Sequence, residues 1–187
     1  MPSQFSFYRV VIVRKSVDGV TAPMLARFLG KARRSVGVSG EVTLLLSTNA
    51  ELKRLNRQFR GKAYATDVLS FPSEFDGHGG DIAISADIAC RNGQLLGHGT
   101  AVEVKVLILH GLLHLAGYDH ESDNGRMARA ERRLRRLLGL PEGLIERADR
   151  EPVRKGTALT RAKRPQPSAD KSSKSRPAMR ARRSRKR

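Results

Sequence analysis

Apolar and polar positions over the first 140 residues alternate between strand-like and helix-like periods. Apolar runs bounded by polar residues predict strands at residues 7–13, 41–47, 66–71 and 81–84. Between the first two runs, apolar residues recur every three or four positions over residues 21–36, which indicates an amphipathic helix. A strand, a helix and a second strand in this order predict that the first two strands pair in parallel.

Two capping boxes indicate where further helices begin. Thr48 and Glu51 open the short helix TNAELKRLNRQF, and Thr100 and Glu103 open the segment AVEVKVLILHGLLHLA, residues 101–116. The second segment is apolar nearly all round. This pattern is expected of a helix buried at the centre of a domain.

The remaining segments complete the predicted fold. Helical patterns cover about residues 86–95 and 123–138, and in the latter six arginines surround an apolar stripe. The stripe consists of Met127, Ala130, Leu134, Leu137 and Leu138. A Gly-rich loop at 72–80 joins the two short strands and suits an antiparallel pair. We therefore expect a single α+β domain at residues 1–150, with its core at about 5–140 and a mixed four-stranded sheet packed with about five helices.

Residues 151–187 differ in composition from this domain. They hold 14 Lys and Arg against two acidic residues, whereas residues 1–150 hold 22 against 16. A segment with so few large apolar residues cannot offset the entropy lost on ordering, so we predict a disordered basic tail. Such cationic arms bind polyanions through counterion release, which favours nucleic-acid binding over a purely solubilising role.

Cysteine usage and the apolar runs indicate the compartment. The single cysteine, Cys90, excludes an intramolecular disulfide and favours a reducing environment. Arg9 breaks the amino-terminal apolar run and Arg14 closes it, unlike in a secretory signal peptide. No stretch approaches the roughly 18 apolar residues of a membrane span. We expect a cytoplasmic protein without membrane association.

The segment HGLLHLAGYDH, residues 110–120, holds three of the five histidines. On a helix His110 and His114 share one face about 6 Å apart along the axis, and Gly117 can turn the chain so that His120 returns towards them. Imidazoles in an apolar helix are costly to bury unless partnered, and one divalent metal satisfies both. Three imidazoles favour zinc with a fourth position for water, as in catalytic sites; hydrogen-bonded core histidines are the alternative.

The residues beside these histidines bear on the chemistry of the metal. In HExxH zinc peptidases a glutamate general base follows the first histidine, and here that residue is Gly111. Peptide hydrolysis is therefore the second choice. Asp119 is a candidate for orienting a metal ligand or transferring a proton, and a solvent-facing loop aspartate is the alternative.

Three segments together resemble the YbeY family of bacterial endoribonucleases. HGLLHLAGYDH resembles the family signature HGxLHLxGYDH, and LNRQFRGKAYATDVLSFP (55–72) and GDIAIS (80–85) resemble two other family segments in the same order. The resemblance spans roughly residues 5–140 and leaves out the tail. It implies an α+β domain with a mixed sheet under several helices.

The resemblance also implies a function and site residues. It implies one Zn²⁺ ion bound by His110, His114 and His120, and catalytic roles for His114 and for Arg60, whose guanidinium would contact the phosphodiester. The implied activity is cleavage of single-stranded RNA in 16S rRNA 3′-end maturation and in ribosome assembly and quality control. The implied partners are rRNA, the small ribosomal subunit, ribosomal proteins and assembly GTPases.

Several questions stay open at the level of sequence. Zinc would activate water or would polarise a phosphoryl oxygen for attack by a ribose 2′-hydroxyl, and both routes fit. Two other functions compete with RNA hydrolysis. A zinc metallopeptidase explains only the histidines, and a non-catalytic RNA-binding assembly factor pinned by zinc leaves the open metal position without a use.

Overall fold

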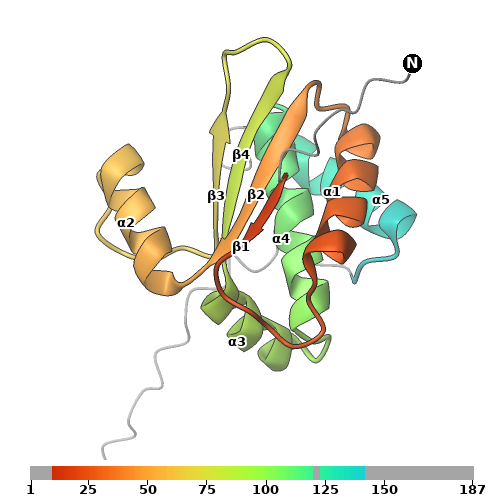
Figure 1. The fold of residues 1–187 in the computed structure, drawn as a ribbon. Coiled ribbons are helices and arrows are strands. Elements are labelled where there is room, and N and C mark those ends of the chain that lie inside the picture. Colours follow the sequence, from red (N-terminus) through yellow and green to blue (C-terminus); the bar gives the residue numbers. More distant parts are fainter. Residues whose placement is uncertain (1–9, 120–122, 142–187) are drawn as a thin grey trace, which may run out of the picture. The chain divides into compact units, whose positions relative to one another are not determined.

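The computed structural model describes residues 10–119 and 123–141. Within them the strands are β1 (Val11–Val13), β2 (Glu41–Ser47), β3 (Val68–Pro72) and β4 (His78–Ser85). The helices are α1 (Ala22–Val36), α2 (Asn49–Arg60), α3 (Ala86–Leu96), α4 (Thr100–Leu115) and α5 (Arg126–Leu138) (Figure 1). The predicted α+β class, with a four-stranded sheet and five helices, is confirmed for this part of the chain.

The sheet is mixed, with the strand order β1-β2-β4-β3. Strand β2 pairs in parallel with β1, with Val11 opposite Leu44, and in parallel with β4, with Leu44 opposite Ile82. Strand β3 pairs antiparallel with β4, with Ser70 opposite Ile82. Both the parallel pairing of the first two strands and the antiparallel pair are therefore confirmed.

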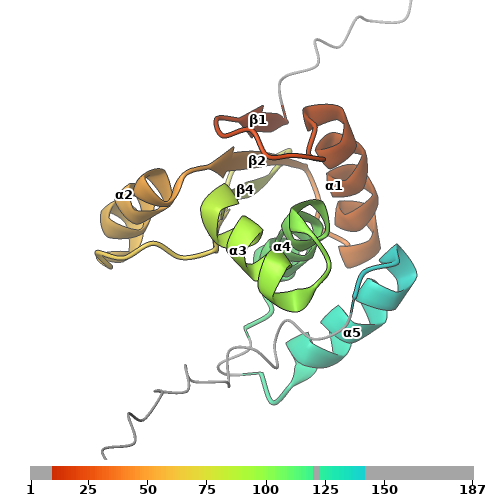
Figure 2. The ribbon, with the colours of Figure 1, turned by 90° about the horizontal axis from the view of Figure 1, so that it is seen from below.

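The two faces of the sheet are covered unequally. Leu44, Leu46 and Ile82 point into the main core, which they share with α1 and α4. On the opposite face, Leu52 of α2 packs in a smaller cluster with Leu69 and neighbouring strand residues. Figure 2 shows α1 and α4 close together and α2 set apart from them. This leaves part of the second face without a covering helix.

Helix α4 is buried at the centre of the domain, as its nearly all-round apolar pattern predicts. It lies close to the sheet at Gly111, where an added Cβ would lie 3.0 Å from Ile82 Cγ2 and 3.0 Å from Ser70 Oγ. A side chain at this position would force its neighbours to shift by a few tenths of an ångström. Among the described residues no single helix is long and apolar enough to cross a membrane, and only α3 and α4 together pass that test, as a pair bent by 113°.

Of the two predicted capping boxes, one marks a helix start and the other is wrong. Thr48 Oγ1 accepts a hydrogen bond from Glu51 N at 3.3 Å and caps α2. At α4 the N-cap is Gly99, without a side-chain hydrogen bond, and Thr100 is already helical. The fully buried Glu103 instead lies 2.7 Å from His98 Nε2. The reason is that α4 has its N-cap at Gly99, one residue before Thr100, so Glu103 is the fourth helical residue and not the third, as a capping box requires.

The boundaries of β3, β4 and α5 differ from those predicted. Strand β3 covers 68–72 rather than 66–71, and β4 begins at His78 rather than at 81. The reason is that the end of the Gly-rich loop pairs with β2 and so belongs to the sheet. Helix α5 begins at Arg126, not at Asp123, whose Oδ2 accepts from Met127 N at 2.7 Å.

The apolar stripe predicted for α5 needs a further correction. Leu137, assigned to the stripe, is 63% exposed, whereas Glu131 and Arg135 are 2% and 1% exposed. One of the six arginines is therefore buried. The reason is the face that α5 turns towards α4. This face includes Met127 and Leu134, and Glu131 and Arg135 lie on it as well.

Other predictions fall outside the described residues. These are residues 7–9 of the first predicted strand, His120, and the tail at 151–187. The chain divides into two units, Met1–Glu151 and Pro152–Arg187, and every described residue belongs to the first. The domain boundary and the disorder of the tail stay predictions.

Candidate active site

The two histidines of α4 point their outer ring nitrogens at each other. His110 Nε2 and His114 Nε2 are 3.1 Å apart, and the ring centroids are 4.8 Å apart at an angle of 73°. Two ligand atoms each 2.0–2.1 Å from a tetrahedral zinc ion are about 3.3 Å apart. The spacing of these nitrogens therefore fits two ligands of one such ion. Both histidines are partly buried in the last turns of α4.

A cavity of about 370 Å³ lies beside these imidazoles. It is lined by Arg60, Lys62, Thr66, Asp67, Val68, Ser70, His110, His114 and Asp119. Four of the residues singled out from the sequence, His110, His114, Arg60 and Asp119, thus line one cavity although they come from separate segments. We call it the histidine cavity.

The third predicted ligand, His120, lies outside the described residues. Within 10–119 and 123–141 no group of three His, Cys, Asp or Glu side chains is placed to hold a metal ion. The chain does turn after α4 as predicted. Gly117 adopts a left-handed conformation with φ of 82°, and its amide donates to the His114 carbonyl at 3.0 Å. Asp119, which follows, is exposed and lines the histidine cavity.

The cationic side of the cavity comes from the end of α2 and the segment after it. Arg60 is the last residue of α2, and its Nη2 donates to the Ser70 carbonyl of β3 at 3.4 Å. The buried Asn56 holds the following loop, since its Nδ2 donates to the Tyr64 carbonyl at 2.8 Å and its own carbonyl accepts from Lys62 N at 3.3 Å. These contacts place two positive side chains, Arg60 and Lys62, at the histidine cavity.

The position after the first histidine faces the sheet. Ser70 Oγ donates to the Gly111 carbonyl at 3.2 Å, and an added Cβ at residue 111 would meet Ser70 and Ile82. A glutamate here would be directed at the strands. The general base of an HExxH peptidase would therefore displace its neighbours at this position.

His110 has a second partner that the sequence analysis missed. Its Nδ1 lies 3.4 Å from Glu131 Oε2, and Glu131 Oε1 accepts from Arg135 Nε at 2.8 Å. Burial raises the pKa of Glu131, but the hydrogen bond with His110 and the charge of Arg135 outweigh burial, so this pKa lies below its ordinary value. Arg135 Nη2 also donates to Glu131 Oε1, so the guanidinium contacts Glu131 as it would a carboxylate. Its helical spacing from Met127 and Leu134 was the available signal, because all three share one face.

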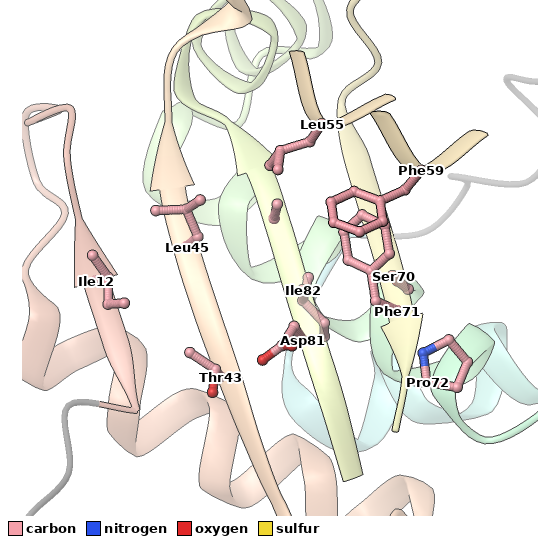
Figure 3. Close-up of a pocket in the computed structure, with 11 residues that line it drawn as sticks. Ile12, Thr43, Leu45, Leu55, Phe59, Ser70, Phe71, Pro72, Asp81 and Ile82 are labelled. Atoms are coloured by element: carbon pink, nitrogen blue, oxygen red, sulfur yellow. The ribbon is translucent and has the colours of Figure 1, made fainter. Parts of the chain in front are cut away.

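A second, larger cavity of about 620 Å³ lies on the sheet face that α1 and α4 do not cover (Figure 3). Its wall is mainly apolar and comprises Ile12, Thr43, Leu45, Leu55, Phe59, Ser70, Phe71, Pro72, Asp81, Ile82 and Ala83. The rings of Phe59 and Phe71 are 5.1 Å apart, and Phe59 is 59% exposed. None of the residues singled out from the sequence lines this apolar cavity.

The chain matches the family model described as Endoribonuclease YbeY over residues 12–139. The Endoribonuclease YbeY of Koribacter versatilis (strain Ellin345) is 50% identical over 155 residues, which cover 83% of this chain and 100% of that protein. The one of Solibacter usitatus (strain Ellin6076) is 47% identical over 137 residues, 73% of this chain and 92% of that protein. A solution structure of a Thermotoga maritima protein is 28% identical and covers 69% of this chain and 89% of that chain, with a TM-score of 0.49.

The α+β fold and the histidine cavity define a domain that places two converging imidazoles beside cationic side chains. The family match and the two relatives identify its class: this chain belongs to the YbeY family of endoribonucleases. The resemblance of its three motifs to that family is confirmed.

Proposed function

We propose that this protein is a zinc-dependent endoribonuclease that cleaves single-stranded RNA. The observation that carries the proposal is the histidine cavity, where two converging imidazoles lie beside Arg60 and Lys62. Imidazole nitrogens are ligands that zinc prefers, and cationic side chains attract a phosphodiester. The relatives of this chain bear the name Endoribonuclease YbeY, in agreement with that combination.

In this proposal His110 and His114 hold the zinc ion, with His120 as the third protein ligand. When bound, zinc supplies Lewis-acid chemistry at the phosphodiester. His114 is catalytic in the sense that it holds the metal at the reacting group. Asp119, next in sequence to His120, is proposed to orient that ligand or to accept a proton at its carboxylate.

Arg60 and Lys62 hold the substrate in this proposal. A guanidinium can contact two phosphate oxygens at once, and charge that develops on those oxygens strengthens the contact. Within the described residues, the hydrogen bond of Arg60 is one long bond to the Ser70 carbonyl, so other donor nitrogens of its guanidinium can be directed at RNA. Its proposed role is therefore to bind and polarise the phosphodiester.

The proposal is tested by adding purified full-length protein to single-stranded RNA and, separately, to casein, each with and without a metal chelator. We expect chelator-sensitive RNA cleavage, no casein cleavage, and no RNA cleavage by His114→Ala, which also controls for contaminating nucleases. Casein cleavage would instead support the metallopeptidase. RNA binding without cleavage, in a protein that holds zinc, would support the non-catalytic assembly factor.

The cellular role is also a proposal. We propose that the protein acts in the cytoplasm on rRNA of the small ribosomal subunit, in 16S rRNA 3′-end maturation and ribosome quality control, with ribosomal proteins and assembly GTPases as further partners. The support is the family and the net charge of +18. Depletion of the protein should lead to accumulation of small-subunit rRNA with an unprocessed 3′ end. Normal rRNA ends after depletion would contradict this role.

A further inference from the structure

A buried ion pair lies directly behind His110. Glu131 and Arg135 are one turn apart on α5, and both are almost completely buried. Arg135 Nε and Nη2 both donate to Glu131 Oε1, while Glu131 Oε2 faces His110 Nδ1 at 3.4 Å. The two oxygens of one carboxylate thus have separate partners. One binds the guanidinium and the other contacts the imidazole.

Packing alone does not explain this pair. Taking two charges out of water is costly, and replacing a buried ion pair by apolar residues of similar volume often leaves stability unchanged or higher. Apolar side chains flank the pair along α5, since Met127 and Leu134 belong to one buried apolar cluster with Val106 and Leu113 of α4. A more apolar α5 would fit this environment. The pair therefore calls for a role other than stability.

Further hydrogen bonds hold Arg135 in place. Arg135 Nη1 donates to the Pro141 carbonyl at 2.7 Å, beyond the end of α5, and the Leu140 amide donates to the Arg135 carbonyl at 2.8 Å. These bonds leave Arg135 few alternative positions. Because Arg135 fixes Glu131, the carboxylate oxygen that faces His110 is fixed as well.

We propose that Glu131, held by Arg135, is a positioning residue that sets the tautomer and ring orientation of His110 for metal binding. A carboxylate accepts hydrogen bonds only, so His110 Nδ1 must carry the hydrogen and Nε2 presents its lone pair towards His114. Metal-binding histidines commonly donate their other ring N–H to a carboxylate in this way. The proposal rests on the proposed zinc site and adds the support from α5.

The test compares wild-type protein with the double variant E131M/R135L, which removes both charges and so leaves no unpaired buried ion. Zinc affinity is measured by competition with a chromophoric chelator, and Co²⁺ affinity by its visible absorption. We expect the double variant to fold and to bind both metals about 10–100-fold more weakly, the usual effect of losing such an outer partner.

A matched control is Glu103→Gln. Glu103 is also a fully buried glutamate of this domain with a histidine partner, His98 at 2.7 Å, and neither residue lines the histidine cavity. We expect its metal affinity to remain that of the wild type. Unchanged affinity in a folded E131M/R135L, or an equal loss in Glu103→Gln, would overturn the positioning role.

A second measurement needs no variant and no metal. Nitrogen NMR of the metal-free wild type, at a pH well above the ordinary histidine pKa of about 6.5, reports which ring nitrogen of His110 carries the hydrogen. We expect hydrogen on Nδ1, and hydrogen on Nε2 would overturn the inference even if the double variant fails to fold. Wild-type protein that binds neither metal would contradict the proposed zinc site instead, while the NMR result would still test Glu131.

Discussion

The two cavities on either side of β3 differ in almost every chemical respect. The histidine cavity combines two imidazoles with Arg60 and Lys62, whereas the apolar cavity is larger and is lined mainly by aliphatic and aromatic side chains. Ser70 of β3 lines both cavities. The different linings of the two cavities follow from the residues that pack behind them.

The histidine cavity has structural support that the apolar cavity lacks. Behind His110 lies the Glu131–Arg135 pair, and behind Gly111 lie the strands at close approach. These contacts fix polar side chains in a largely apolar domain, which is the condition for a preorganised site. The apolar cavity instead lies on an incompletely covered sheet face, with Phe59 more than half exposed. Accordingly, we assign the chemistry to the histidine cavity alone.

Apart from the proposed metal ligands, Arg60 is the residue of the histidine cavity whose substitution should lower RNA cleavage most. We expect Arg60→Ala to lower kcat for RNA cleavage by about 10²–10³-fold, the usual effect of removing a donor that stabilises developing charge. Its zinc content should remain unchanged, because Arg60 is not a ligand. Single-turnover cleavage and elemental analysis measure the two quantities.

Arg57→Ala is the control for Arg60. Arg57 is one turn earlier on α2, is exposed and lines neither cavity. We expect its kcat to stay close to that of the wild type. Similar losses in the two variants would show that a general positive charge, rather than the position of Arg60, matters.

A substitution that disturbs the close packing of α4 on the sheet should have an intermediate effect, on stability. We expect Gly111→Val to lower the free energy of unfolding by about 1–3 kcal/mol, because the added atoms overpack against Ile82 and Ser70. Gly30→Val in α1 is the control, since an added Cβ there meets only Arg34 Nη1 at 3.6 Å. Urea unfolding measures the free energy of unfolding of both variants and of the wild type. An equal loss at both positions would contradict the tight packing at Gly111.

Substitution of Asp87, a charged residue that lines neither cavity, should have the smallest effect, a small loss of stability. The ion pair with Lys15 and the hydrogen bond from Asn49 N hold the pKa of Asp87 below its ordinary value. The charged form therefore stabilises the fold above the unfolded pKa of about 3.9, and this contribution is lost as the pH falls through the lower folded pKa. We expect Asp87→Asn to be less stable than wild type near pH 7, by no more than about 1 kcal/mol.

That stability difference should shrink below about pH 4 as Asp87 becomes protonated in the wild type. Urea midpoints at a series of pH values measure it. A difference that stays constant or grows on acidification would show that the pair with Lys15 does not lower the pKa of Asp87.

Local patterns in the sequence predicted most of the fold. The bounds of β2 and the burial of α4 follow from continuous apolar runs, and the start of α2 follows from its cap at Thr48. The errors concern contacts that a residue makes outside its own helix or strand. Glu103 contacts His98, which precedes α4, and the start of β4 is set by pairing with β2.

The sequence predicts the part of the candidate site whose residues lie close together along the chain. The spacing of His110 and His114 on one helix predicts their convergence directly. Arg60 could be placed beside them only through family resemblance, because β3 and α4 meet through tertiary packing. Glu131 and Arg135 were missed because charged residues on a helix are usually exposed. Their burial depends on how α5 packs on α4.

The measurement that tests the central claim most directly is the zinc content of purified full-length protein, determined by elemental analysis for the wild type, His114→Ala and Phe59→Ala. The last variant alters the apolar cavity and leaves the histidine cavity intact. We predict about one zinc ion per chain in the wild type and in Phe59→Ala, and almost none in His114→Ala. Wild-type protein that holds no zinc after reconstitution, or His114→Ala that retains a full equivalent, would contradict the assignment of the metal to the histidine cavity.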